Sequence, residues 1–299
     1  MLQRVRAGLV AWLLVGLAAS SALIGAAPSN ASTIDDRALT SESTTLRGTS
    51  AAAKPVRKPR LTASAKQVEE GDRIALTAAV RAPKTAIRVT LQKWYVPLYF
   101  GTPSWQTVRT LKVHGKPNVG FRAVATNENT ERYRVLVTYK DTRKAVASKP
   151  VNLTVWRWVP LKDYAPYYEA QSGAAIFGTT TINGVAYSGW GAASYSHTGA
   201  WESRFTPGRH CKSFRAVLGV GDISDDGSSG SISFTADNEQ IYTSPTLTPG
   251  MSVSATVPLA KPYRFGIQLL DTTPGGTTGH DDVEAWPVLG EPALLCTGV

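Results

Sequence analysis

Motifs of the common enzyme classes are missing from this chain of 299 residues. It has no GxSxG nucleophile elbow, no HExxH zinc motif and no glycine-rich loop that cradles phosphate. Only four histidines are present, and nothing in their surroundings points to a Ser-His-Asp site. The one remaining catalytic possibility is a carboxylate pair such as Asp281 and Glu284, which could in principle hydrolyse a glycosidic bond. We therefore predict that the protein is not an enzyme.

Long apolar runs are missing as well, with one exception at the N-terminus. Arg4 and Arg6 precede an almost entirely apolar stretch from Ala7 to Ile24, and small residues follow. This plan is typical of a secretory signal peptide, which we assign to residues 1–31 with cleavage after Ala31. The alternative is an uncleaved anchor, the only case in which the protein would contact a membrane. In both cases the expected location is secreted or at the extracellular surface.

Aromatic residues are absent from residues 32–58, which are rich in Ser, Thr, Ala and Arg. Such a segment cannot bury enough apolar surface to fold. We predict a flexible linker here, followed by two folded domains at 59–157 and 158–299.

Cysteine is scarce: only Cys211 and Cys296 are present. An even number of cysteines in a chain with an export signal predicts a disulfide between them. The bond would close a loop of 85 residues, which the chain-entropy model values at about 4–5 kcal/mol. A catalytic or metal-binding cysteine is disfavoured because the sequence has neither a CxxC motif nor a histidine cluster.

Acidic residues are scarce in the first folded half. Between Lys54 and Arg157 there are 21 Lys and Arg against 6 Asp and Glu, a formal charge of +15. From Trp158 onward the counts are 7 and 13, a charge of −6. The contrast favours two separate units, and the basic one could meet an anionic cell-wall polymer. No nucleic-acid partner is predicted, and the alternative is that the cations only keep the domain soluble.

Helical periodicity is absent from both halves. In the first, Ile74, Leu76, Ala78 and Val80 alternate with other residues, as do Tyr133, Val135, Val137 and Tyr139. About seven such strands in roughly a hundred residues predict an immunoglobulin-like β-sandwich. The series VTLQKW, SWQTVRTLKV and GFRAVATNENTERYRVLV resembles bacterial immunoglobulin-like modules of secreted proteins.

An aromatic segment with prolines, Trp94–Pro103, interrupts this alternation. Such a loop could stack on a sugar or grip a partner. We expect instead that it folds back over an open end of the sandwich and covers the core.

The second half is organised around residues 211–244. Phe214, Ala216, Leu218 and Val220 form the core face of one strand, and Ile232, Phe234 and Ala236 that of another. An acidic, glycine- and serine-rich loop joins the two strands. About eight to nine strands in this half predict a jelly-roll-like sandwich, so the whole chain is expected to be all-β.

Three segments carry a resemblance to a known family: GVAYSGWG (184–191), SRFTPGRHCKSFRAVLGVGD (203–222) and GSISFTADNEQIYTS (230–244). Together with residues 262–287 they resemble the NPCBM family, a jelly-roll carbohydrate-binding module. The resemblance covers about residues 158–286. It implies binding of a glycan, often of galactose type, and attachment beside a glycoside hydrolase.

A sugar site needs an aromatic plate and fixed polar groups. Trp190 and Trp201 lie in polar, glycine-rich segments and are the predicted plates, although each could equally be an ordinary core residue. Trp286 is a weaker candidate, because its apolar neighbours suggest burial. The predicted polar contacts are Tyr187, Glu202, His280, Asp281 and Asp282.

The acidic loop offers Asp222, Asp225 and Asp226 to a cation. Clustered carboxylates suit calcium, but the EF-hand spacing and its terminal glutamate are missing. No cofactor is therefore expected, with calcium at these three residues as the tentative exception and a solvated turn as the alternative.

Together these features predict an exported, non-catalytic carbohydrate-binding protein whose C-terminal module binds a glycan. The alternative is a surface adhesion or structural protein whose basic immunoglobulin-like domain holds anionic wall polymers.

Overall fold

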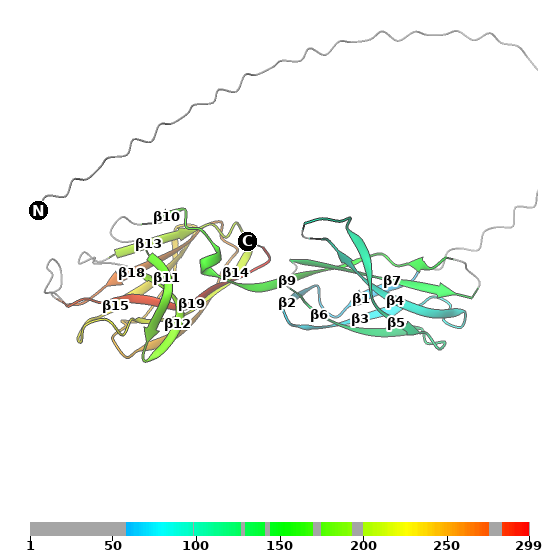
Figure 1. Ribbon diagram of the computed structural model, residues 1–299, viewed down its shortest axis with the longest axis horizontal. Coiled ribbons are helices and arrows are strands. Elements are labelled where there is room, and N and C mark those ends of the chain that lie inside the picture. Colours follow the sequence, from blue (N-terminus) through cyan, green and yellow to red (C-terminus); the bar gives the residue numbers. More distant parts are fainter. Residues whose placement is uncertain are drawn as a thin grey trace, which may run out of the picture. The chain divides into compact units, whose positions relative to one another are not determined.

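The computed structural model describes residues 58–97, 99–126, 129–140, 144–169, 175–192, 200–274 and 283–298. These residues form β-strands and one 3-10 turn, η1 (Leu161–Asp163), so the prediction of an all-β protein is confirmed (Figure 1). Over the described ranges no helix is long and apolar enough to cross a membrane. The predicted signal peptide and nearly all of the predicted linker lie outside the described residues.

Two hydrophobic cores form, one from residues 61–155 and the other from residues 159–296. We call the parts around them the N-terminal sandwich (residues 58–156) and the C-terminal sandwich (residues 157–298). This separation agrees with the change in charge along the sequence. The immunoglobulin-like character of the first sandwich and the boundary at 157/158 stay predictions.

The N-terminal sandwich has two sheets around its core. One contains β1 (Arg60–Ala63), β3 (Arg73–Ala79) and β6 (Asn118–Val124), in that antiparallel order. The other runs β9 (Val151–Pro160), β7 (Thr130–Tyr139), β4 (Ala86–Tyr95), β5 (Ser104–Lys112), with β2 (Gln67–Glu69) parallel to β9 and β8 (Val146–Ala147) beside β7.

Period-two alternation explains why these segments are strands. In β3 every second side chain is buried, and Ile74, Leu76 and Ala78 are at most 1% exposed. The aromatic loop behaves differently from the prediction. Tyr99 is 89% exposed and Phe100 is 95% exposed, so the tip of this loop does not cover the core. The expectation of a covering role is therefore wrong for these two residues, whose side chains point into solvent.

The C-terminal sandwich is built from two antiparallel sheets (Figure 1). The first, sheet C, has the order β11 (Ala175–Ile182), β12 (Val185–Ala192), β19 (Pro287–Cys296), β14 (Cys211–Val220), β17 (Ser252–Pro258), and residues 157–160 of β9 also pair with β19. The second, sheet D, has the order β10 (Tyr168–Glu169), β13 (Ala200–Phe205), β18 (Phe265–Asp271), β15 (Gly230–Ala236), β16 (Glu239–Thr243). Two facing five-stranded sheets agree with the predicted jelly-roll-like architecture.

An aromatic cluster fills the space between sheets C and D. The Phe214 ring lies 4.9 Å from that of Phe234 and 4.8 Å from that of Phe265, measured between centroids. All three side chains are fully buried. The strand residues of the 211–244 run therefore form the centre of this fold, as their alternation predicted.

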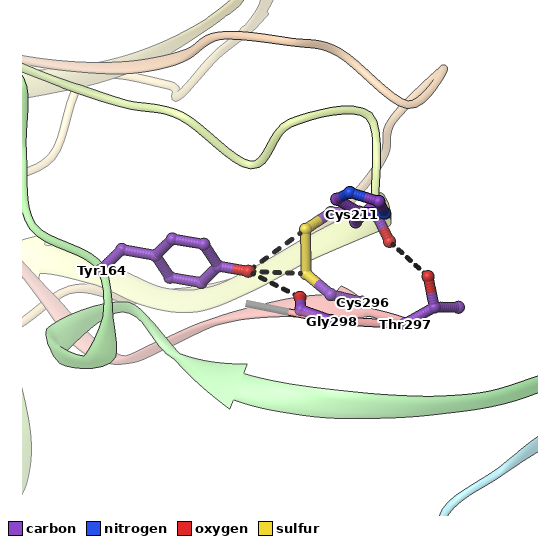
Figure 2. The surroundings of a disulfide bond; sticks show 6 residues. Tyr164, Cys211, Cys296, Thr297 and Gly298 are labelled. Atoms are coloured by element: carbon purple, nitrogen blue, oxygen red, sulfur yellow. Dashed lines mark hydrogen bonds between the residues drawn. A yellow bond between two sulfur atoms is a disulfide. The ribbon is translucent and has the colours of Figure 1, made fainter. Parts of the chain in front are cut away.

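The predicted disulfide between Cys211 and Cys296 is present and fully buried. The two cysteines are register partners of β14 and β19, which places their side chains opposite each other. Figure 2 shows the Tyr164 hydroxyl pointing at the sulfur pair, 3.2 Å from Cys296 Sγ and 3.5 Å from Cys211 Sγ. Burial raises the pKa of the Tyr164 hydroxyl. The bond ties the C-terminal strand β19 to its neighbour β14 in sheet C.

Candidate functional site

The two predicted aromatic plates lie in the core. Trp190 is 1% exposed and Trp201 is 3% exposed. Their register partners, Leu289 and Leu269, are fully buried, so both indoles are on the inner faces of their sheets. Trp190 packs against Phe205 with centroids 6.4 Å apart. Neither ring presents a face to a sugar, and the interpretation of these residues as plates is corrected to a core role.

Of the predicted polar contacts, the two that the structure describes, Tyr187 and Glu202, do not converge. Glu202 lies on β13 of sheet D, where its Oε1 accepts a hydrogen bond from Arg204 Nε at 2.6 Å. Tyr187 lies on β12 of sheet C, where its ring covers the backbone of Gly290. The two side chains therefore belong to opposite sheets. His280, Asp281 and Asp282 lie outside the described residues.

The tentative calcium site is not formed. Asp222 accepts hydrogen bonds at 2.8 Å from the backbone N–H groups of Asn183 and Gly184, in the turn between β11 and β12. Asp225 accepts one at 2.9 Å from the backbone of Glu284. Within the described ranges, no three His, Cys, Asp or Glu side chains come together as metal ligands. Two carboxylates of the acidic loop, those of Asp222 and Asp225, instead hold neighbouring segments by accepting hydrogen bonds from backbone N–H groups.

A hollow on the outer face of sheet C is a candidate binding site. It has a volume of about 280 Å³ and lies over β11, β12 and the entry to β19. We call it the glycine hollow, after the residues of its floor. It is lined by Gly178, Thr179, Thr180, Thr181, Gly189, Gly191, Gly221, Asp222, Ile223, Trp286 and Val288.

Missing side chains create this shape. A Cβ atom at Gly189 would lie 2.1 Å from Thr180 Cγ2, and one at Gly191 would lie 2.5 Å from Val288 Cγ1. These glycines let the neighbouring side chains lie flat on the sheet. At Gly178 a Cβ would meet nothing within 4 Å, so open space lies directly above the backbone there. A rigid sheet therefore presents a concave floor of small residues.

Trp286 forms one wall of the hollow and is half-buried. Its backbone is fixed on both sides: its N–H donates to Ser224 Oγ at 2.9 Å, and its C=O accepts from the Gly221 N–H at 2.8 Å. Sequence reasoning gave this tryptophan little weight because apolar neighbours suggested burial. The structure shows that Trp286 follows a segment that contacts the acidic loop, because the backbone N–H of Glu284 donates to the Asp225 carboxylate. This contact could not be recognised from the sequence.

The chemistry available in the glycine hollow is that of a neutral polar ligand. Trp286 offers part of an aromatic surface, and Thr180, whose side chain lies over Gly189 on this face, offers a hydroxyl that can donate and accept hydrogen bonds. Asp222 adds carboxylate oxygens, already held in position by the Asn183 and Gly184 amides. An aromatic surface with a few fixed polar groups is the usual composition of a small-molecule site.

A second hollow of about 300 Å³ lies on the same sheet, with Trp158, Arg215 and Glu291 among its lining residues. A β-bulge adds one residue to β19 opposite Arg215–Val217, and Glu291 there has a positive φ of 46°. The Arg215 guanidinium lies 4.3 Å from the centroid of the Trp158 ring. Because Arg215 covers this ring, the aromatic face is less available here than in the glycine hollow.

Comparisons with known proteins agree with the sequence resemblance. Residues 162–286 match the model of the NPCBM/NEW2 domain family. No curated protein matches the chain. One similar solved structure is the CBM51 of Clostridium perfringens GH95 in complex with methyl-galactose, at 19% identity and a TM-score of 0.34, covering 46% of this chain and 99% of that one.

Two further similar structures are larger. The CBM51-2 and INT domains of Clostridium perfringens ZmpB match at 13% identity and a TM-score of 0.36, covering 55% of this chain and 37% of that one. The secreted serine protease VesC of Vibrio cholerae matches at 8% identity and a TM-score of 0.30, covering 79% and 50%. The chain thus spans half or less of these two structures. Over residues 162–286, the C-terminal sandwich is similar to the NPCBM/NEW2 domain family.

Proposed function

We propose that the C-terminal sandwich binds a carbohydrate in the glycine hollow and that the protein acts outside the cell without catalysing a reaction. The NPCBM/NEW2 match over residues 162–286 is the observation that carries this proposal. The glycine hollow supports it, because 9 of its 11 lining residues, all but Ile223 and Val288, are Gly, Thr, Asp or Trp, which suit a ligand rich in hydroxyls.

The binding mode follows from the geometry of the hollow. A pyranose has an apolar face that packs on an aromatic ring and hydroxyls that need fixed partners. Among the described residues, Trp286 is the one aromatic side chain that lines the hollow, and the open space above Gly178 leaves room for a ring close to the sheet. Thr180 and Asp222 also line the hollow and can contact hydroxyls. A sheet floor is ordered before a ligand arrives, so less ordering entropy opposes binding.

A glycan array probed with the full mature chain tests this proposal. Trp286→Ala is expected to weaken binding by about 5- to 30-fold, which corresponds to the loss of an aromatic contact of about 1–2 kcal/mol. The matched control is Tyr263→Ala, which removes a half-exposed ring outside the hollow and should leave binding unchanged. Equal binding by both variants and the parent would remove the glycine hollow as the site.

Absence of catalysis is tested on the glycan that the array identifies. Incubation of the protein with this glycan should release no reducing sugar. Release that depends on the folded protein would assign an enzyme instead.

Export is proposed from the leader alone. The intact mass of the protein recovered from the culture medium should correspond to a chain that begins at Ser32. Recovery only in the membrane fraction, with residues 1–31 retained, would indicate the anchor instead.

A further inference from the structure

The outer face of the β7–β4–β5 sheet carries arginine and tryptophan side chains next to one another. We call it the arginine–tryptophan face and define it by Arg88, Trp94, Trp105, Lys112, Arg132 and Arg134. Their register explains the grouping. Trp94 pairs with Trp105 across β4 and β5, and Arg88 pairs with Lys112 on the same two strands. Arg134 is the partner of Gln92, two residues from Trp94 on the same face.

Stacking holds this face in one arrangement. The centroids of Trp94 and Trp105 lie 5.2 Å apart in an edge contact. Arg134 lies 4.3 Å from the Trp105 centroid, and Arg132 lies 5.6 Å from that of Trp94. Arg134 Nε also donates to Gln92 Oε1 at 2.9 Å. Guanidinium groups packed on indole rings lose rotamer freedom before any ligand arrives, which favours binding by those groups.

The cations of this face have no carboxylate partner. In the part of the chain that the structure describes, none of Arg88, Lys112, Arg132 and Arg134 has a carboxylate oxygen within 4.0 Å. The nearby acid Glu131 is fully buried on the opposite side of the strand, where it pairs with Lys93. Arg88 and Lys112 are direct cross-strand partners, and Arg132 and Arg134 lie two residues apart on β7, so like charges repel within each pair and lower stability. A purely structural role for this face does not account for that cost.

Guanidinium groups in this arrangement fit a phosphorylated polymer. Each presents a planar fork of N–H donors that matches a phosphate in a bidentate manner. Arg132 and Arg134 are two residues apart on β7, so their Cα atoms are about 6.6 Å apart along the strand. Cations in a row at this interval suit a flexible chain that carries a phosphate in each repeat.

We propose that the arginine–tryptophan face binds an extracellular phosphodiester polymer of the polyol-phosphate type. The expected export of the protein selects a wall polymer over a nucleic acid. This inference is independent of the carbohydrate site proposed for the other sandwich, since the two use different surfaces and different chemistry.

The test uses the full mature chain and purified poly(glycerol phosphate) on a biosensor at two salt concentrations. The parent should bind, and its affinity should fall steeply from about 50 to 200 mM salt because counterions are released. Arg88→Gln combined with Arg132→Gln should weaken binding by about tenfold or more at the lower salt. The matched control is Arg73→Gln combined with Arg122→Gln, which removes two exposed arginines from the opposite sheet and changes the net charge equally.

The control should bind within about threefold of the parent, as expected when phosphate contacts rather than net charge decide affinity. Equal losses in the two variants would overturn the proposal in favour of non-specific attraction to a basic domain. Tighter binding to double-stranded DNA or to polygalacturonate than to poly(glycerol phosphate) would overturn the choice of ligand. Glycan-array binding should be unchanged in both variants, so a failure here is distinct from a failure of the carbohydrate proposal.

Discussion

One pair of tryptophans in each sandwich shows opposite placement, inside the core in the C-terminal sandwich and on an outer face in the N-terminal sandwich. In the C-terminal sandwich Trp190 and Trp201 are buried between the sheets, and a disulfide closes the fold. In the N-terminal sandwich Trp94 and Trp105 lie on an outer face among arginines, and no cysteine is available. Position relative to the sheet, not the polarity of neighbouring residues, decides which tryptophan can meet a ligand.

The interiors of the two sandwiches differ in the groups that they enclose. The N-terminal sandwich encloses the Glu131 carboxylate, which accepts hydrogen bonds from Lys93 Nζ at 2.8 Å, from both the N–H and hydroxyl of Thr126, and from the Tyr133 hydroxyl at 2.9 Å. The core cluster of the C-terminal sandwich holds apolar side chains and the disulfide. One fold relies on a satisfied polar network and the other on a covalent link.

Removing the disulfide is expected to have the largest effect and to act on one sandwich alone. Replacement of Cys211 and Cys296 by serine should lower the free energy of unfolding by about 4–5 kcal/mol, because the unfolded chain regains the freedom of an 85-residue loop. Hydrogen exchange followed by mass spectrometry measures this by region. Amides of β14 and β19 should lose protection, while those of β3 and β7 keep it. Equal losses in both sandwiches would show that they do not unfold separately.

Glu131→Gln is the corresponding change in the N-terminal sandwich. It should lower the free energy of unfolding by about 2–3 kcal/mol, because Lys93 then lacks its buried counter-charge. The matched control Glu70→Gln removes an exposed carboxylate and should change stability by less than about 0.5 kcal/mol. Denaturant unfolding compares the variants, and an equal effect of the two changes would contradict a special role for the buried group.

The pH dependence of the free energy of unfolding tests the role of the buried Glu131 carboxylate. Burial alone would raise the pKa of Glu131, but the hydrogen bonds from Lys93, Thr126 and Tyr133 outweigh it and hold the pKa below its ordinary value. A lowered folded-state pKa adds stability above the unfolded-state pKa of about 4.3, and this stability is lost as the pH falls through the folded-state value. The parent should therefore lose more stability than Glu131→Gln between pH 5 and pH 3. Equal losses of stability in the parent and in Glu131→Gln would contradict this prediction.

Of the three sets of substitutions that test stability, a change in the glycine floor should lower the free energy of unfolding least. Gly189→Ala forces a methyl group against Thr180 and should cost about 1–3 kcal/mol. Gly178→Ala is the control, since its Cβ would enter open space and should change stability by less than about 1 kcal/mol. Thermal unfolding measures both. Equal shifts would mean that close packing at Gly189 does not shape the hollow.

Much of the fold could be predicted from the sequence. Alternation placed Phe214, Leu218, Ile232 and Phe234 in the core, because a strand must turn every second side chain toward the same face. The disulfide followed from two cysteines in a chain with a predicted leader. The covering role of the loop at Tyr99 and Phe100 did not follow, since nothing local shows whether a core is already closed.

The candidate site was largely hidden from sequence reasoning. Trp190 and Trp201 were assigned to a sugar because of their polar neighbours, yet those neighbours point to the other face of the same strands. Asp222 was assigned to a cation, yet it binds amides that are 39 and 38 residues away along the chain. The half-buried Trp286 received little weight.

The all-β class, the two units of opposite charge, the disulfide and the family resemblance over the second half could all be predicted from the amino-acid sequence. These properties depend on composition and on local periodicity, which each segment carries alone. The exposed tryptophans, the glycine hollow and the arginines that share one face could be found only in the folded protein. Those properties depend on the register between strands such as β4 and β5 or β12 and β19, and register is fixed by pairing between distant segments.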